Sequence, residues 1–310
     1  MSESFVTGRG VVNAWECDQW GHLNVQFYLA KASDALAVMA AQSGLNPSQE
    51  RQSGRGLLPV SDRILFKREL RAGDIYTFRS GVRAIEVDGA LAVASTLINL
   101  DTGAEAATFE TRLRWAALDS GELLPCPDEV RLAASAVWVA QAPPPRPAAH
   151  AHPTDHGSDY LLLTYRGSVE SWECDARGTA PPRAHIARFA ECVNHLFLAM
   201  GVSKRDMRER RLGSAALDYD IDYRRPMRVG QAVEVRSGVL AAGEKVFYFF
   251  HRLIDSASGE VLTSIVVAAL FFDLDARKSV PIPDAVRSAA QLLVALPQPR
   301  PAGTAAIRRS

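Results

Sequence analysis

The sequence predicts an α+β protein in which one folding unit occurs twice along a chain of 310 residues. One observation behind this prediction is a repeated segment, because Trp15-Glu16-Cys17-Asp18 recurs as Trp172-Glu173-Cys174-Asp175. The other is the order of elements, since each half has one long helix-like segment followed by strand-like runs. A helix that precedes consecutive antiparallel strands is typical of the α+β class.

The repeat keeps its register well beyond these four letters. At an offset of 157 positions, residues 15–44 and 172–201 share 7 identities in 30 positions without a gap. The same offset also pairs Phe66 with Tyr223 and Gly73 with Gly230. Chance can repeat four letters, but it rarely holds one register this far, and self-similarity at a fixed period indicates a repeated structural unit.

Each half contains the same expected elements in the same order. Both long segments have helix-forming residues, no internal Pro or Gly, and a terminal Gly44 or Gly201 that serves as a helix stop. Gly-containing turn signals separate the later strand-like runs. The expected elements are strand 6–15, helix 25–43 and strands 57–70, 74–85, 90–100 and 106–117, then strand 160–172, helix 183–200 and strands 212–223, 232–240, 245–254 and 261–272.

The domain organisation follows from this repeat. We expect a first domain at 1–118, a linker at 119–158, a second domain at 159–296 and a disordered tail at 297–310. Within the linker, residues 129–139 are expected to form a short helix. The Pro-rich stretch 143–147 is expected to be extended, as in polyproline.

Composition narrows the class of protein. Lys+Arg and Asp+Glu both number 35, so the neutral chain offers no electrostatic footprint for nucleic acid or an anionic membrane. There is no signal-peptide layout, and no apolar run approaches the roughly 20 residues that span a bilayer. The four cysteines form no C-x-x-C pair, which argues against a zinc or redox motif. We therefore expect a reduced, cytoplasmic protein without a metal or cofactor.

A motif that begins in the first copy of the repeat contains Asp18, His22, Asn24 and Tyr28. Its spacing resembles the signature of hotdog-fold thioesterases, in the 4-hydroxybenzoyl-CoA thioesterase-like and acyl-ACP thioesterase families. The segment 223–230 is similar to a strand motif of hotdog proteins. The resemblance implies a tandem, or double, hotdog fold, each unit being a long helix wrapped by an antiparallel sheet. Because such units bind ligand between them, a chain with both units would complete its own site.

The resemblance also implies an activity, the hydrolysis of an acyl-CoA or acyl-ACP thioester to a free acid and a thiol. Asp18 stands just before the first helix, where these families place a carboxylate that can act as general base or nucleophile. Free backbone N–H groups at about residues 21–25 would polarise the carbonyl. Gly21, Leu23 and Tyr28 are the expected substrate-binding residues of this segment, with Gly21 allowing close approach to the backbone.

Two further residues of the motif have alternative interpretations. His22 is expected to orient water or to hydrogen-bond the thioester, and a structural loop role is the alternative. Asn24 is expected to hold Asp18 or the water in place. An N-cap role is equally compatible with the sequence, because Asn is among the best N-caps and a helix begins here.

The second copy departs from the motif after Asp175. His22 is replaced by Thr179, Asn24 by Pro181 and Tyr28 by His185. Because proline lacks an N–H, we expect the active site at Asp18 and a degenerate or altered second site at Asp175. The second domain would still supply a wall of the first site. Glu191 is another candidate for the second site, with a polar helix stripe or an interface carboxylate as the alternative.

Basic residues gather at matching strand positions of the two halves, with Arg68 in the first and Arg225 in the second. They are candidates for binding coenzyme A phosphates or the acidic face of acyl carrier protein, or they are solvated strand positions. Two other functions stay open: a hotdog hydratase or dehydratase acting on acyl thioesters, and a non-catalytic acyl-CoA-binding module. No nucleic acid or membrane partner is expected. Pairing of chains into a homodimer or higher oligomer stays open.

Overall fold

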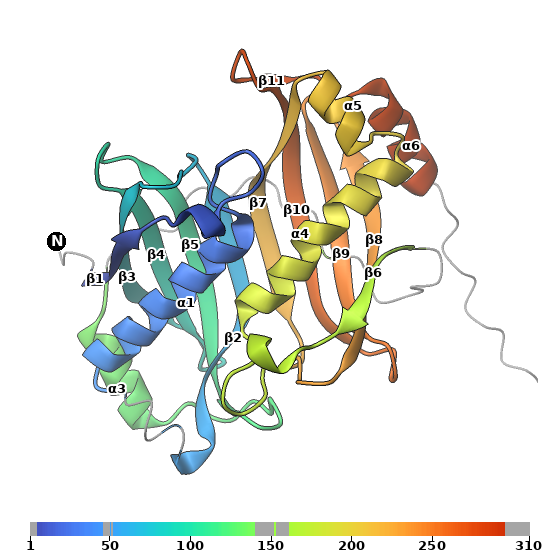
Figure 1. Ribbon diagram of the computed structural model, residues 1–310. Helices are drawn as coiled ribbons and strands as arrows, with labels where there is room; N and C mark the ends of the chain where they lie inside the picture. The colour runs from blue at the N-terminus through green and yellow to red at the C-terminus, as the bar shows by residue number, and fades with distance from the viewer. Residues whose placement is uncertain (1–4, 46–49, 51, 140–151, 153–160, 295–310) are drawn as a thin grey trace, which may run out of the picture.

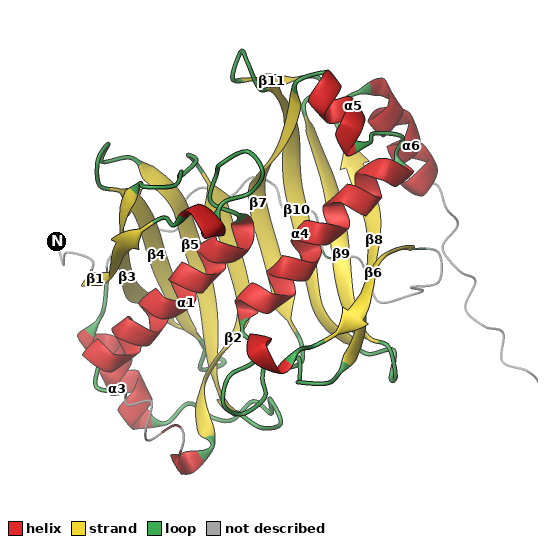
Figure 2. Ribbon diagram, viewed as in Figure 1, coloured by secondary structure: helices red, strands yellow, loops and turns green. Residues whose placement is uncertain are grey.

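The computed structural model describes residues 5–45, 50, 52–139, 152 and 161–294 of the chain. Eleven strands form one sheet in the order β1-β3-β4-β5-β2-β7-β10-β9-β8-β6, with β11 added beside β10. Every pairing in it is antiparallel. The two long helices, α1 and α4, lie on one face of this sheet (Figures 1 and 2).

The elements of the two halves correspond almost residue by residue. In the first half they are β1 (Phe5–Val11), the 3-10 helix η1 (Ala14–Glu16), α1 (Val25–Gln42), β2 (Arg55–Phe66), β3 (Ile75–Ile85), β4 (Leu91–Asn99), β5 (Glu105–Ala117) and α3 (Asp128–Ala136). In the second they are β6 (Leu162–Ser168), η2 (Ser171–Glu173), α4 (Pro182–Ala199), α5 (Lys204–Glu209), β7 (Leu212–Tyr223), β8 (Ala232–Ala242), β9 (Val246–Asp255), β10 (Val261–Asp273), β11 (Lys278–Val280) and α6 (Asp284–Val294).

The strand order reads as the same unit written twice about a central pair. The strands β2 and β7 meet antiparallel there, with Ile64 opposite Tyr219. This joins two five-stranded units, and α1 and α4 contact each other across the junction. The hydrophobic core lies between the helices and the sheet, where Phe78, Phe197 and Phe271 are fully buried. The predicted tandem hotdog architecture is thereby confirmed.

Some expected boundaries differ from the structure. The first strand ends at Val11 and not at residue 15, because the chain turns into η1 before the helix. The strand expected at 57–70 is β2, which begins at Arg55 and ends at Phe66. The linker helix expected at 129–139 is α3, from Asp128 to Ala136. The Pro-rich stretch 143–147 and the tail 297–310 lie outside the described residues.

The repeated Trp-Glu-Cys-Asp segment has a structural role in both halves. Glu16 accepts a hydrogen bond from the Asn13 N–H at 2.9 Å and pairs with Lys31 of α1 at 2.7 Å. Glu173 makes the same two interactions, with the Glu170 N–H at 2.9 Å and with Arg188 of α4 at 2.8 Å. Each glutamate thus fastens the loop before the helix to the helix itself.

Among the described residues, no helix is both long enough and apolar enough to cross a membrane.

Candidate active site

Asp18 lies in the tight turn between η1 and α1, and backbone amides hold one of its two carboxylate oxygens. Oδ1 accepts hydrogen bonds from the Trp20 N–H at 2.8 Å and the His22 N–H at 3.1 Å. Gly21 has a φ of 77°, a left-handed conformation that glycine adopts without strain, and so closes the turn. No described residue hydrogen-bonds Oδ2. The carboxylate is therefore fixed in place with one oxygen available to a ligand.

The amides that come after Asp18 were expected to be free, and most of them are not. Gly21 N–H donates to Asp18 O at 3.0 Å, Leu23 N–H to Leu70 O at 2.7 Å, and Asn24 N–H to Glu16 O at 2.9 Å. The His22 amide is held by Asp18 Oδ1. Val25 is the first residue of α1, and within the described chain its N–H has no acceptor. The expectation of a set of free amides was therefore wrong, and one donor remains at the positive end of the helix dipole.

Asn24 is the N-cap of α1. Its φ and ψ of −67° and 141° are extended, and its Oδ1 accepts a hydrogen bond from the Gln26 N–H at 3.2 Å. The capping role left open by the sequence is confirmed.

Two cavities meet at Asp18. The outer chamber, of about 830 Å³, and the inner chamber, of about 390 Å³, share lining residues from both halves of the molecule. The shared residues are Asp18, Trp20, Leu23, Val25 and Ser214–Ala216 of β7. The second domain thus walls the site around Asp18, as the sequence predicted.

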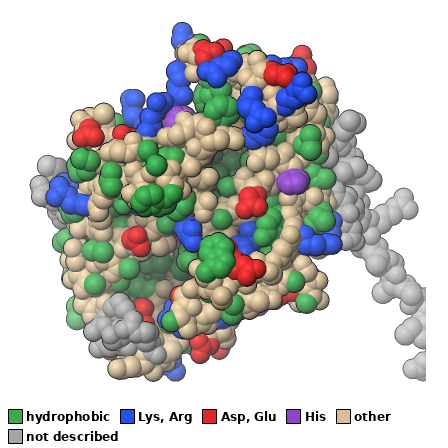
Figure 3. Space-filling model, viewed as in Figure 1, with side chains coloured by type: hydrophobic (Ala, Val, Ile, Leu, Met, Phe, Trp, Pro, Cys, Tyr) green, Lys and Arg blue, Asp and Glu red, His purple; other side chains and the backbone are tan. Residues whose placement is uncertain are grey.

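The outer chamber is rimmed by charge. Lys67, Arg68 and Arg71 come from the first half and Arg277 from the β10–β11 turn of the second. Figure 3 shows Lys and Arg side chains along the upper edge of this face. Lys67 pairs with Glu105 at 2.5 Å, whereas Arg68 is exposed and has no ion-pair partner in the described chain. The chamber can therefore receive an anionic group.

His22 faces the outer chamber and is linked to its charges. Its Nε2 lies 3.2 Å from Glu69 Oε2 and 3.4 Å from Arg71 Nη2, and Glu69 also pairs with Arg277 of the second half. Burial lowers the pKa of His22 below its ordinary value, although Glu69 and Asp18 act in the opposite direction. A neutral imidazole thus connects the Asp18 turn to the contact between the two halves.

Tyr28 lines the outer chamber as a buried wall residue. Its ring packs edge-on against Phe66 with the ring centroids 5.1 Å apart. Burial raises the pKa of its hydroxyl well above the ordinary value. Leu23, also buried, belongs to both chambers.

The inner chamber runs between α4 and the sheet of the second half. Phe189, Val193 and Phe197 line it from α4, and Tyr219, Phe249 and Val267 line it from the strands. Glu191 and Asn194 also belong to it, as does Lys204 at the start of α5, whose pKa burial lowers. Glu191 was grouped with Asp175 as a possible second site, but the structure places it in the chamber of Asp18.

The second copy of the motif carries its aspartate in a different setting. Asp175 is exposed, its Oδ1 accepts from the Arg177 N–H at 2.9 Å, and its Oδ2 pairs with the Arg177 guanidinium at 2.8 Å. Pro182 takes the place of Val25, so the corresponding amide donor is absent. Arg225, the counterpart of Arg68, pairs with Glu260 at 2.8 Å and lies in a separate pocket.

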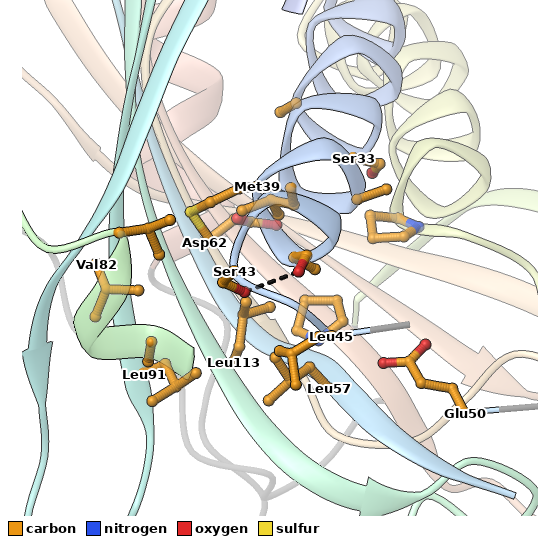
Figure 4. Close-up of a pocket in the computed structure, with 18 of the residues that line it drawn as sticks. Ser33, Met39, Ser43, Leu45, Glu50, Leu57, Asp62, Val82, Leu91 and Leu113 are labelled. Carbon is orange, nitrogen blue, oxygen red and sulfur yellow. Dashed lines mark hydrogen bonds between the residues drawn. The ribbon is translucent and has the colours of Figure 1, made fainter. Parts of the chain in front are cut away.

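A third cavity, of about 260 Å³, is the first-half counterpart of the inner chamber (Figure 4). Met39, Leu57, Val82, Leu91 and Leu113 make it largely apolar, and Pro181 and Pro182 of the second half also line it. Asp175 does not line it.

Several residues of the site were missed by sequence reasoning. The sequence predicted free amides at about residues 21–25 but did not show that only Val25 among them lacks an acceptor in the described chain, because that depends on which carbonyls face the others. Lys204 of α5 and Tyr219 of β7 carried no motif, and only the placement of the second half beside the first turn brings them into the chamber of Asp18. The signal that could have found α4 was the pairing of repeated units, which sets one helix against the other.

The comparisons with known proteins agree with this architecture. The model of the thioesterase-like superfamily matches residues 12–134 and again 169–290. No curated protein matches the sequence.

Among solved structures, a protein assigned as an oleoyl thioesterase from Lactobacillus plantarum matches with a TM-score of 0.66 at 13% identity, over 87% of this chain and 97% of that one. The 12:0-ACP thioesterase from Umbellularia californica also gives 0.66, at 10% identity over 86% and 93%. An acyl-ACP thioesterase from Bacteroides thetaiotaomicron gives 0.59, at 11% identity over 86% and 96%. At these identities the likeness shows the shared fold. Because the family model covers most of both halves, the chain belongs to the thioesterase-like superfamily.

Proposed function

We propose that this protein hydrolyses an acyl thioester at Asp18. The observation that carries the proposal is the carboxylate itself, with Oδ1 fixed by two amides and Oδ2 left to a ligand, where two chambers meet. Family membership supports the reaction class. The catalytic residues, the position of the acyl group and the nature of the carrier are proposed from the geometry of the site.

The reaction needs a group that attacks or activates water and a group that stabilises the oxyanion. Asp18 Oδ2 removes a proton from a water that adds to the thioester carbon, or adds to that carbon itself and forms a mixed anhydride that water then cleaves. In either course the C–S bond breaks, the thiolate takes up a proton, and water supplies the new oxygen of the acid. The Val25 N–H, at the positive end of α1, donates to the carbonyl oxygen as negative charge develops there.

The two chambers suggest how an acyl thioester would be oriented in the site. The basic rim of the outer chamber suits the phosphates of coenzyme A or of the phosphopantetheine of acyl carrier protein, with Arg68 and Arg71 as the contacts. The inner chamber, with its aromatic and aliphatic walls, suits the acyl group. The thioester carbon then lies at the junction beside Asp18. Arg225 is outside this path and has no part in the proposal.

The four cysteines carry free thiols, which supports our expectation that the protein works in a reducing compartment such as the cytoplasm.

A thiol-release assay over a panel of acyl-CoA and acyl-ACP thioesters tests the proposal. Wild-type protein should release free thiol and acid from members of the panel, and Asp18→Asn should not. Enoyl thioesters belong in the panel, because a hydratase would add water to them without releasing thiol. Binding without any turnover would instead indicate a non-catalytic acyl-CoA-binding module. Thiol release by Asp18→Asn at the wild-type rate would overturn the assignment of Asp18.

A further inference from the structure

The inner chamber contains two buried polar side chains with unused hydrogen-bonding atoms. His251 of β9 is 1% exposed and Tyr219 of β7 is 8% exposed, and both line the chamber. His251 Nε2 and the Tyr219 hydroxyl have no hydrogen-bond partner among the described residues. Both residues border the chamber, so a ligand that fills it without pairing with these two atoms would leave them unsatisfied, at a cost of about 1–3 kcal/mol each.

A chain of hydroxyl groups indicates which nitrogen of His251 carries its proton. The Thr164 hydroxyl donates to Val235 O at 3.2 Å, so its single proton is used there. With the Thr164 proton placed on Val235 O, Ser237 is the donor in the 2.6 Å contact between Thr164 and Ser237. Ser237 Oγ therefore accepts, at 2.6 Å, from the Nδ1–H of His251. Burial lowers the pKa of His251 to about 3, so the ring is neutral and Nε2 presents a lone pair.

The imidazole ring is held rigidly in this orientation. Phe189 of α4 stacks on it with ring centroids 5.6 Å apart and planes inclined by 16°. Phe249 meets it edge-on, with centroids 5.2 Å apart. These three residues line the inner chamber and not the outer one, whereas Asp18, Leu23 and Val25 line both chambers. The acceptor therefore lies in the part of the inner chamber away from the Asp18 junction.

The counterpart cavity of the first half does not offer the same pair. Asp62 stands at the position of Tyr219, and its carboxylate is already satisfied by Thr111 at 2.5 Å and Tyr223 at 2.9 Å. Ser95 stands at the position of His251, since they face Ser80 and Ser237 in matching register. Of the two matching cavities, therefore, only the inner chamber, which adjoins Asp18, has this histidine and tyrosine among its described lining residues.

We propose that this chamber selects an acyl group that carries a hydroxyl group on the part remote from the thioester, which donates to His251 Nε2 and accepts from the Tyr219 O–H. A chamber that offers one acceptor and one hydroxyl that can donate complements an alcohol or phenol, whereas a saturated hydrocarbon end would leave both groups unpaired. The inference rests on the proposed function, in that the inner chamber is taken as the acyl pocket of Asp18.

Binding measurements test this inference separately from turnover. The probes are pairs of acyl-CoA analogues with a methylene in place of the thioester sulfur, each pair sharing one aliphatic or aromatic skeleton and differing by one remote hydroxyl. Calorimetry on the wild-type protein should give at least a tenfold lower Kd for the hydroxylated member of at least one pair. Tyr219→Phe, which removes one oxygen, and His251→Phe should each reduce that preference to threefold or less. His195→Ala, an exposed position on α4, is the matched control and should keep the wild-type preference.

The outcomes separate the two proposals. Equal affinity for both members of every pair, or a preference that survives Tyr219→Phe and His251→Phe, overturns the hydroxyl-binding inference. If His251→Phe does not fold, Tyr219→Phe decides, because that change alters no ring volume. Thiol release from the corresponding true thioesters reports on the proposed hydrolysis: if none is released while the binding preference is found, the hydrolysis fails and the chamber's selectivity stands.

Discussion

The two helix starts of this molecule have the same backbone course but present different atoms to a ligand. In each, a glutamate fastens the loop to the helix and an aspartate accepts amides of its own turn. At α1 the aspartate keeps one free oxygen and stands near the Val25 N–H. At α4 the aspartate is neutralised by Arg177, and Pro182 has no N–H to offer. The repeated Trp-Glu-Cys-Asp segment therefore gives both halves the same loop structure, whereas the groups available to a ligand depend on the residues that follow it.

We expect the largest effect on thiol release when Asp18 and Asp175 are each replaced by asparagine in separate variants. Asp18→Asn keeps the side-chain shape and its amide contacts at Oδ1 but removes the base or nucleophile, so kcat for thiol release should fall by roughly 10²–10⁴-fold. Asp175→Asn, in the other copy, should change kcat by less than threefold. Steady-state thiol release by both purified variants measures this, with circular dichroism to verify folding. A loss of similar size at Asp175 would mean that both copies are active.

The next effect concerns a single backbone hydrogen. Val25→Pro gives the first helix the residue that begins the second one. The backbone should accept this change, because proline suits the first position of a helix and the preceding Asn24 is already extended. Loss of the N–H should lower kcat by roughly 10²–10³-fold, about 2.7–4 kcal/mol, the range for one oxyanion donor.

Val25→Ala is the control for that change, since it trims the side chain and retains the amide. Its kcat should stay far above that of Val25→Pro, and both variants should bind the methylene analogues with similar Kd. If proline is tolerated without loss of turnover, the oxyanion donor lies elsewhere and Val25 has only a structural place in the turn.

The sequence predicted that the two copies of the motif differ, but it predicted only some of the residues that surround Asp18. The Asp18 motif and the loss of its pattern at Thr179 and Pro181 follow from residue types at fixed spacing. Glu191 was grouped with Asp175 because both belong to the second copy of the repeat. In the structure the pairing of β2 with β7 sets α4 beside the first turn, and Glu191 lines the same chamber as Asp18. Arg225 matches Arg68 in register, yet it pairs with Glu260, the residue before β10.

Backbone and buried hydrogen bonds explain the rest of what sequence reasoning missed. Whether an amide is free depends on which carbonyl faces it, as with Leu23 and the distant Leu70. His251 went unnoticed because its register partner Ser95 lies at an offset of 156 and not 157, after a one-residue change between β3 and β4. Its acceptor character depends on Ser237, a contact that only the folded sheet creates.

The two halves should also differ in acid sensitivity. His185, in the place of Tyr28, is buried and its pKa is lowered to about 4, chiefly by burial. The pKa of His251 is lowered to about 3 for the same reason. Both histidines therefore take up protons on unfolding, and stability is full above the unfolded-state pKa of about 6.5 and is lost as the pH falls below it. By pH 5 each should have cost about 2 kcal/mol of unfolding free energy.

Urea unfolding at pH 7.5 and pH 5 measures this loss. His185→Tyr, which copies the first half, should shrink the difference in unfolding free energy between the two pH values by about 2 kcal/mol. His195→Ala, which removes an exposed histidine, should leave that difference nearly unchanged. An undiminished difference in His185→Tyr would show that this histidine is protonated in the folded protein at pH 5.

The smallest expected effect separates the two roles considered for Asn24. The N-cap hydrogen bond from Gln26 should contribute about 1 kcal/mol, so Asn24→Ala should lower the free energy of unfolding by that amount. Asn24→Ser retains a capping oxygen but removes the amide group that faces the inner chamber. Because Pro181 occupies this position in the second copy and makes no side-chain cap, only the first copy should depend on this cap.

We expect Asn24→Ser to keep the wild-type unfolding free energy within a few tenths of a kcal/mol and its kcat within tenfold. A variant with unchanged stability and a hundredfold loss of turnover would instead assign the amide of Asn24 to the reaction, and its replacement by Pro181 would then be a further chemical difference between the two copies.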